Sequence, residues 1–300
     1  MTIFVAEVSS NHHNDLSRCL AFVDRAAEIG CHSVKFQLFK VEELFAPEIL
    51  AVSEDHRRRK EWELPIEFLP SIYARCRERG VGFACTPFYL QAVQHLRPYV
   101  DFYKIASYEL LWDDLLIACA KTGKPVVLST GMATLAEVVR AAQVLKDAGA
   151  VTVTVLHCVS GYPTPLEQCN LSAMSTIEQE TGCRVGWSDH TVSAAVIYRA
   201  VHRWRASMVE FHLDLDGSGD EFRIGHCWLP EQIQPVIKNC SHLSVMDGSG
   251  VKFPAKAELP DRDWRADPSD GLRPMLSKRA EWVAGNHTVQ VKAFTDQTKG

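Results

Sequence analysis

The chain has 300 residues, of which 32 are basic and 37 are acidic, so its formal net charge is −5. This length predicts one large domain with an extension, because α/β barrels reach about 250 residues as one unit. The acidic balance argues against an electrostatic binder of nucleic acid, which would carry a basic surface. Hydrophobic residues make up 46% and charged residues 23% of the chain, and this composition excludes a disordered protein.

The sequence shows no targeting or membrane-spanning segment. No run of about 18 apolar residues occurs, so we expect no membrane partner, and the start of the chain lacks the basic region of a signal peptide. The ten cysteines are spread from Cys19 to Cys240 without a CxxC pair, which fits neither a disulfide framework nor a zinc knuckle. We expect a cytoplasmic protein with buried thiols, and zinc bound by thiolate is the second interpretation.

Short β-branched or aromatic segments alternate with longer helical segments along the chain. The predicted strands, in chain order, are Ile3–Val8, Ser33–Gln37, Gly82–Cys85, Asp101–Ile105, Pro125–Ser129, Thr152–Leu156, Arg184–Trp187 and Met208–His212. The helices predicted to follow them are Asp15–Ile29, Pro65–Arg79, Leu90–Leu96, Trp112–Lys121, Leu135–Ala148, Ser172–Glu180, Ser193–Arg203 and Glu231–Cys240. Pro235 lies inside the last helix, which is therefore expected to be kinked or to start later.

Eight successive strand–helix units predict parallel strands, because each return to the sheet needs a crossover helix. A closed (β/α)8 TIM barrel uses this number of units, so the fold class is α/β. We assign the barrel to residues 1–242 and a non-barrel C-terminal extension to residues 243–300. A long insertion, Val41–Glu63, follows the second strand and contains the charge run His56–Lys60, which is most often a solvated face but could steer an anionic substrate.

Polar residues gather at the ends of the predicted strands, where barrels of this class carry their active sites. They include Glu7, Lys35, Thr86, Lys104, Ser107, Glu109, Ser129, His157, Ser160, Tyr162, Ser188, His190, Glu210 and His212. Lysines inside strands are costly unless their charge is used, so Lys35 and Lys104 indicate a site for a phosphate or carboxylate. Two alternatives remain open: each lysine pairs with a glutamate such as Glu7 or Glu109, or Lys104 is a Schiff-base nucleophile.

His190 and His212 end adjacent predicted strands, so the two imidazoles are expected to meet at the mouth of the barrel. Two imidazoles without a nearby cysteine suit a divalent metal that keeps positions open for water and substrate. No GxGxxG or phosphate-loop pattern occurs, so a nucleotide cofactor has no support.

A series of short motifs, in order along residues 3–240, resembles the N-acetylneuraminate (sialic acid) synthase family. The motifs are Phe4-Val-Ala-Glu7 with Asn11-His12, Val34-Lys-Phe-Gln37, Cys85-Thr-Pro-Phe88, Tyr103-Lys-Ile105 with Ser107 and Glu109, Leu128-Ser-Thr-Gly-Met132, Leu156-His-Cys158, Tyr162-Pro-Thr-Pro165 and Ser188-Asp-His-Thr191.

This resemblance implies a transferase of carbohydrate or polysaccharide biosynthesis. It would condense phosphoenolpyruvate with an aldehyde-form sugar, giving a 2-keto-3-deoxy sugar acid and phosphate. The resemblance implies that phosphoenolpyruvate is held by Lys35, Thr86, Lys104, Ser107, Ser129, Ser160 and Ser188. It implies that His190 and His212 bind manganese or magnesium, which would polarise the aldehyde, and that Tyr162 and Asp220 line the sugar site. Glu7 and Glu109 are the candidates for organising water or moving protons, with Lys104 beside them as a catalytic residue.

Members of that family usually carry a C-terminal antifreeze-like domain that reaches across a dimer to the partner's sugar site. Residues 243–300 show no counterpart, although a homodimer is still implied. The family's Gly-Pro-Asp-His segment is replaced by Gly217-Ser-Gly-Asp-Glu221. Two alternative functions stay open: a 3-deoxy sugar acid synthase acting on a phosphorylated aldose, which the Arg57–Lys60 run would bind, and a non-catalytic barrel that binds a small anion.

Overall fold

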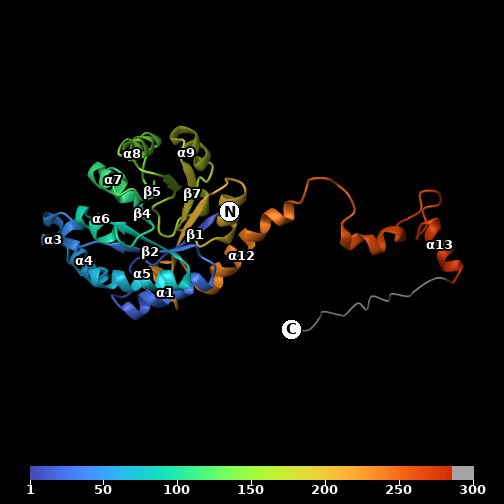
Figure 1. Cartoon of the computed structure of the whole chain (residues 1–300), viewed down its shortest axis with the longest axis horizontal. Coiled ribbons are helices and arrows are strands. Elements are labelled where there is room, and N and C mark those ends of the chain that lie inside the picture. Colours follow the sequence, from blue (N-terminus) through green and yellow to red (C-terminus); the bar gives the residue numbers. More distant parts are fainter. Residues whose placement is uncertain (286–300) are drawn as a thin grey trace. The chain divides into compact units, whose positions relative to one another are not determined.

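The computed structural model describes residues 1–285, apart from the side chains of Leu243 and Ser244. Eight parallel strands close into a barrel, because β1 pairs with both β2 and β8 (Figure 1). The strands are β1 (Ile3–Glu7), β2 (Ser33–Leu38), β3 (Gly82–Pro87), β4 (Phe102–Ile105), β5 (Val126–Ser129), β6 (Val153–His157), β7 (Arg184–Asp189) and β8 (Met208–Leu213). The predicted (β/α)8 barrel and its eight strands are confirmed.

Helices return the chain from one strand to the next around the outside of the barrel (Figure 1). They are α1 (Leu16–Glu28), α5 (Leu69–Arg79), α6 (Leu90–Leu96), α7 (Asp113–Ala120), α8 (Leu135–Asp147), α9 (Ala173–Thr181), α10 (Ala194–His202) and α12 (Pro230–Asp247). The last helix begins at Pro230, before the predicted start, and it contains Pro235. None of the described helices combines the length and apolar character needed to cross a bilayer.

Several short elements lie outside the strand–helix alternation. The insertion after β2 folds into α2 (Val41–Leu44), α3 (Pro47–Val52), α4 (Glu54–Arg58) and η1 (Arg59–Trp62). Beyond β8 lie α11 (Asp220–Ile224) and β9 (Cys227–Trp228), and the other short helices are η2 (Ile66–Phe68), η3 (Ser107–Glu109), η4 (Leu166–Gln168), η5 (Lys256–Trp264) and α13 (Leu276–Val283). The two-residue strand β9 pairs in parallel with β8 and places Cys227 opposite His212.

The interior of the barrel is layered along the strands. A small apolar cluster contains Val5, Ala84, Phe102, Val127, Leu156 and Met208. Because side chains alternate along a strand, the residues two positions further on face the same interior. They are Glu7, Thr86, Lys104, Ser129, Cys158 and Glu210. The apolar layer therefore closes the barrel beneath a mostly polar layer at the carboxyl ends of the strands.

The chain divides into two compact units, Met1–Ser244 and Val245–Gly300. In the described part of the second unit, the rings of Trp264 and Trp282 lie 5.4 Å apart in an edge-to-face arrangement. Asp267 accepts hydrogen bonds from the Ser269 and Leu276 backbone N–H groups at 2.9 and 2.8 Å. These contacts are local to the unit, and the large apolar core belongs to the barrel.

Candidate active site

A cavity of about 760 Å³ opens at the carboxyl ends of the barrel strands. Every strand, or the residue directly after it, contributes to the lining. The predicted site residues that line the cavity are Glu7, Lys35, Thr86, Lys104, Ser107, Glu109, Ser129, Tyr162, Ser188, His190 and His212. Two predicted residues, Ser160 and Asp220, are not among the lining residues.

Two buried lysines and two buried glutamates form the floor of this cavity. The Nζ atom of Lys35 lies 2.5 Å from Glu7 Oε2 and 3.8 Å from Glu210 Oε1. The Nζ atom of Lys104 lies 3.3 Å from the same Glu210 oxygen. The lysine–glutamate pairing left open by the sequence therefore exists for Lys35 and Glu7, whereas Lys104 pairs with Glu210. Both ammonium groups still face the cavity.

The ion pairs of this floor favour the charged forms of Lys35 and Glu210. Burial disfavours the charge on Lys35, but the Glu210 and Glu7 carboxylates outweigh it and raise the pKa of Lys35. Burial likewise disfavours the charge on Glu210, but Lys104 and Lys35 outweigh it and lower the pKa of Glu210. The buried Glu210 Oε2 has no hydrogen-bond partner within the described residues. This oxygen atom can therefore accept a hydrogen bond from a polar ligand in the cavity.

Hydroxyl groups lie around the lysines. Thr86 Oγ1 accepts a hydrogen bond from Lys35 Nζ at 3.2 Å, and Ser188 Oγ donates to Glu210 Oε1 at 3.4 Å. Ser107 Oγ accepts from the Gly131 backbone N–H at 2.9 Å. Ser129 Oγ is buried and has no partner in the part of the chain that the structure describes. Two cations among hydroxyl donors suit a group with several acceptor oxygens, such as a phosphate.

Gly131 lets the chain turn closely after β5. A Cβ atom at this position would lie 2.1 Å from Ser160 Oγ and 2.9 Å from Ser107 Oγ. Any side chain would therefore collide with both serines. Ser160 therefore lies close to Gly131, and its buried Oγ has no hydrogen-bond partner among the described residues.

Glu109 is a carboxyl group with an unusual proton affinity. It lies in η3, is buried, and lines the cavity. Burial raises the pKa of Glu109 to about 7, and the nearby Lys104 opposes this shift only in part. Its Oε2 atom has no hydrogen-bond partner among the described residues. A carboxyl group that titrates near neutral pH is suited to proton transfer.

Three imidazoles meet on one side of the cavity, beside the Tyr162 ring. The ring centres of His190 and His212 lie 5.3 Å apart, and those of His212 and His226 lie 4.8 Å apart. The predicted meeting of His190 and His212 is therefore present, and His226 is an addition. Tyr162 lies 4.4 Å from the His190 ring and 4.9 Å from the His226 ring, between ring centres.

The protonation of these imidazoles differs with their neighbours. Burial and the adjacent His212 lower the pKa of His190 to about 3, so this ring is neutral. Its Nδ1 atom lies 2.8 Å from the Val159 carbonyl oxygen, and with Nδ1–H donating there, Nε2 keeps its lone pair. Burial disfavours the charge on His212, but Glu221 outweighs it and raises the pKa of His212 well above its usual value. The rings therefore differ in proton affinity within one cluster.

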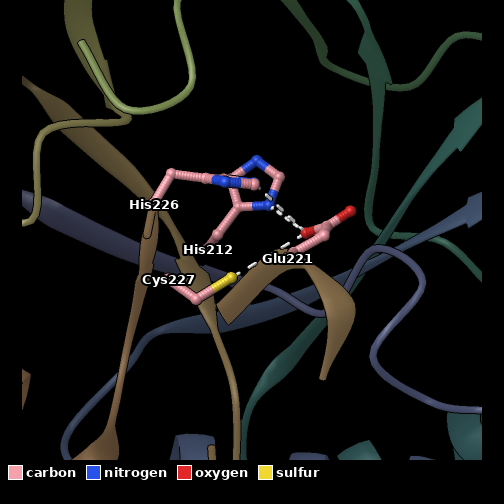
Figure 2. Close-up of side chains that lie close together, drawn as sticks. All are labelled: His212, Glu221, His226 and Cys227. Carbon is pink, nitrogen blue, oxygen red and sulfur yellow. Dashed lines mark hydrogen bonds and ion pairs between the residues drawn. The ribbon is translucent and has the colours of Figure 1, made fainter. Parts of the chain in front are cut away.

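The acidic residue that reaches the cavity from α11 is Glu221, not Asp220. Asp220 is exposed and its Oδ1 accepts from Arg223 NH1 at 2.5 Å, so the structure does not support its predicted place in the sugar site. Glu221 turns inward, and its Oε2 lies 2.7 Å from His212 Nδ1 (Figure 2). Burial disfavours its charge, but the attraction to His212 outweighs this and lowers the pKa of Glu221 well below its usual value.

Sequence reasoning also missed His226 and Cys227. The only signal was a His-Cys pair after Gly225, of which Cys227 begins a strand of two residues. That strand is too short to produce a recognisable alternation. The donor set that results, imidazoles with carboxylate and thiol, is one that binds transition metals, so the residues present fit a divalent transition ion such as manganese better than magnesium.

The insertion after β2 forms another part of the wall. His56, Arg59 and Trp62 line the cavity together with Phe45. The Arg59 guanidinium lies over the Phe45 and Trp62 rings, 5.3 and 5.7 Å from their centres. In the charge run, Arg58 pairs with Glu54 and Lys60 pairs with Glu42. Arg59 has no such carboxylate partner within the described residues, and it is the arginine of the run that faces the cavity.

Comparison with known proteins agrees with the motif resemblance. The model of the NeuB family matches residues 22–252. An uncharacterized protein of Methanocaldococcus jannaschii is 34% identical over 260 residues, covering 86% of this chain and 75% of that protein. The N,N'-diacetyllegionaminic acid synthase of Campylobacter jejuni is 30% identical over 272 residues, covering 86% of this chain and 80% of that enzyme.

A solved structure shows the same architecture. The N-acetylneuraminic acid (sialic acid) synthetase of Leptospira borgpetersenii, in complex with citrate, has a TM-score of 0.76 to this chain at 26% identity. The match covers 90% of this chain and 93% of that one. The barrel, the family model and the relatives lead to one conclusion: the chain belongs to the NeuB family.

Proposed function

We propose that this chain condenses phosphoenolpyruvate with an aldehyde-form sugar, giving a 2-keto-3-deoxy sugar acid of the sialic acid kind and phosphate. One observation carries the proposal: two buried lysines lie among hydroxyl groups in the same cavity as a cluster of imidazoles. The Campylobacter relative is a synthase of N,N'-diacetyllegionaminic acid, which supports a sugar acid as the product.

In this proposal, phosphoenolpyruvate binds on the floor of the cavity. Lys35 and Lys104 meet its negative charge, and hydroxyl groups complete the contacts. Those hydroxyl groups belong to Thr86, Ser107, Ser129 and Ser188. Ser160, whose buried Oγ has no hydrogen-bond partner among the described residues, stays a predicted contact of phosphoenolpyruvate. Because Glu7 and Glu210 already pair with the lysines, the ligand shares the ammonium groups with them, and this favours a ligand that carries several acceptors.

In this proposal His190 and His212 face a divalent ion, for which the resemblance implies manganese or magnesium. When bound, such an ion polarises the aldehyde oxygen of the acceptor as a Lewis acid. Tyr162 packs beside both imidazoles and positions the sugar against them. The neutral state of His190 suits it to bind a cation without first losing a proton.

The chemical steps follow from the two substrates. The enol carbon C3 of phosphoenolpyruvate bonds to the aldehyde carbon, whose oxygen takes up a proton. Water adds to C2, where positive charge has developed, and phosphate leaves from the resulting tetrahedral centre. Glu109 supplies or accepts a proton at this centre, because its pKa of about 7 allows either state near neutral pH. Glu7, held by Gln37 Nε2 at 2.6 Å, positions Lys35 and the water.

A second acceptor class is favoured by a specific observation. Arg59 faces the cavity without a carboxylate partner among the described residues, and a guanidinium binds phosphate oxygens well. The alternative substrate is therefore a phosphorylated aldose, bound by Arg59 across the cavity from the imidazoles. The implied homodimer remains a prediction, which sedimentation of the purified chain would test.

The test is phosphate release from phosphoenolpyruvate with manganese and a panel of aldehyde sugars, each supplied with and without a terminal phosphate. We expect release with at least one N-acetylated hexosamine or related sugar. We also expect that His190→Ala or His212→Ala abolishes metal-dependent turnover while the circular dichroism spectrum is retained. No release with any sugar of the panel would favour the non-catalytic anion-binding barrel.

A further inference from the structure

A four-residue cluster beside the proposed substrate site combines donors that metals bind. His212, Glu221, His226 and Cys227 each offer one ligand atom, and these atoms all lie within 4.8 Å of one another. Glu221 Oε2 is at the centre: it lies 2.7 Å from His212 Nδ1, 3.5 Å from His226 Nε2 and 3.9 Å from Cys227 Sγ (Figure 2). In a tetrahedral zinc site with bonds of about 2.0–2.3 Å, the donor atoms are separated from one another by comparable distances.

The fold brings these residues together by strand register. His212 on β8 is directly opposite Cys227 on β9, and paired residues of parallel strands project to the same side. β9 is held in place because Trp228 Nε1 donates to Asp189 Oδ2 at 3.0 Å, and Trp187 Nε1 donates to Asp189 Oδ1 at 3.0 Å. His212 and Cys227 therefore sit on paired strands of the barrel rather than on a loop.

The donor side chains are also oriented by the residues behind them. Ser9 Oγ donates to Glu221 Oε1, and Ser10 Oγ donates to the same oxygen at 3.3 Å. Asn11 Nδ2 lies 3.0 Å from the Leu213 carbonyl oxygen and 3.5 Å from Cys227 Sγ, donating to both. Such contacts fix ligand orientation at metal sites. The buried Nδ1 of His226 has no hydrogen-bond partner in the described residues, so only Glu221 competes with a cation for this ring.

We propose that His212, Glu221, His226 and Cys227 form the principal metal centre of this chain, and that it takes a thiophilic transition ion such as Zn²⁺ or Co²⁺ in preference to Mg²⁺. Two imidazoles, a carboxylate and a thiolate are ligands of zinc and its neighbours, whereas Mg²⁺ prefers oxygen ligands. On binding, the Cys227 thiol and the His212 imidazolium each release a proton to solvent. His190, which is not in the four-donor group, faces the same cavity and contributes less to affinity.

This centre extends the proposed function. Only the use of the ion in the condensation rests on that proposal. Binding itself is measured without substrates. The metal-free full-length protein is titrated with Co²⁺, and affinity, absorption spectrum and thermal unfolding are recorded. We expect a sulfur-to-cobalt charge-transfer band in the near ultraviolet, visible-region intensity typical of four-coordination, and no displacement of Co²⁺ by millimolar Mg²⁺.

Variants with matched controls separate the four-donor centre from a two-histidine site. Glu221→Gln and His226→Ala should weaken Co²⁺ binding by at least about tenfold, and Cys227→Ser should remove the charge-transfer band. Two control variants should change neither the affinity nor the charge-transfer band. They are Asp220→Asn, on the neighbouring outward-facing carboxylate, and Cys31→Ser, on a buried thiol at the opposite end of the barrel. His190→Ala should weaken binding less than His226→Ala does.

Two outcomes would overturn the four-donor centre. One is wild-type affinity and spectrum in Glu221→Gln, His226→Ala and Cys227→Ser, together with loss of binding in His190→Ala. The other is Co²⁺ binding by the wild type that Mg²⁺ reverses, with no sulfur band. Because both isosteric variants, Glu221→Gln and Cys227→Ser, are read by spectrum and by thermal unfolding, misfolding would be recognised. If Co²⁺ binds as expected but no sugar gives phosphate release, the proposed function fails and this inference stands.

Discussion

At the scale of single residues, Glu109 gives the clearest pH dependence. Burial raises its pKa from 4.5 to about 7, so the folded protein favours the neutral acid, and the carboxylate forms as pH rises through about 7. The ionised form would repel an anionic substrate and lose its donor proton. We expect kcat/KM for phosphoenolpyruvate to fall as pH rises through this range, and Glu109→Gln to lack that fall. The pH profiles of both proteins measure it.

The sign of this change is the critical outcome for Glu109. A kcat/KM that rises through pH 7 in the wild type, and not in Glu109→Gln, would assign the residue as a base instead of an acid. The same linkage acts on stability: ionising a buried acid whose folded pKa is raised costs folding free energy, and the loss is complete only above the folded pKa. As the pH rises from about 5 to about 8, Glu109→Gln should therefore lose less stability than the wild type.

Lys104 is predicted to bind the anionic substrate directly. Lys104→Ala removes one ammonium group and leaves Glu210 with only Lys35 among its described ion-pair partners. Loss of a hydrogen bond to a charged group costs about 1.5–3 kcal/mol, so the KM for phosphoenolpyruvate should rise roughly 10- to 100-fold. Steady-state kinetics measure this. Lys121→Ala, on an exposed lysine at the end of α7, is the control, and an unchanged apparent affinity in Lys104→Ala would refute the role.

What the sequence could predict at this scale depended on regular structure. Lys35, Lys104 and His212 lie in strands whose alternation fixes which side chains face the interior. Asp220 and Glu221 lie in a one-turn helix after a loop, where the register cannot be read from periodicity. The sequence therefore pointed to Asp220, whereas the short helix α11 turns the next residue, Glu221, toward His212.

At the scale of elements, the insertion after β2 is predicted to determine the acceptor. The Arg59 guanidinium is exposed and stacks over Phe45 and Trp62 at the cavity wall. Arg59→Ala should raise the KM for a phosphorylated aldose about tenfold and leave the KM for phosphoenolpyruvate unchanged, because Lys35 and Lys104 hold that substrate. Steady-state kinetics with each substrate varied in turn measure this.

The neighbouring Arg58 gives a matched control for this experiment. It carries the same charge in the same segment, but its NH2 atom lies 2.9 Å from Glu54 Oε1 and it does not line the cavity. Arg58→Ala should therefore leave both KM values unchanged. Equal effects of the two substitutions would mean that the segment acts through its overall charge, and an effect of neither would exclude the insertion from phosphate binding.

The elements differ in how far the sequence could define them. The eight barrel strands and their helices were predictable because each carries several apolar residues at a regular spacing. The insertion instead folds into helices of four to six residues, α2 to α4, and β9 has two residues. Such elements are stabilised by packing on the barrel and not by their own periodicity, so the sequence indicated the charge run but not which of its arginines faces the cavity, and it did not indicate the position of Cys227.

At the scale of the whole molecule, the site and the large core belong to one unit. All the cavity-lining residues lie within Met1–Ser244, and the apolar core runs from Phe4 to Ile237, with Cys240 packed against it. In the described part of the second unit, residues 245–285, Asp267 is the only buried polar side chain and no apolar side chain is buried. Apolar burial supplies most of the folding free energy, so the second unit contributes little to it.

A chain ending after Asp247, the last residue of α12, should therefore keep the fold and the site. Changes that remove no buried apolar surface alter stability by about 0.5 kcal/mol or less, which is roughly 2 °C in the unfolding temperature of a domain this size. Thermal unfolding and Co²⁺ affinity of the shortened and full-length proteins measure this. A large fall in the unfolding temperature would mean that residues 248–300 pack on the barrel. An unchanged unfolding temperature with weaker sugar binding would assign them to the acceptor site instead.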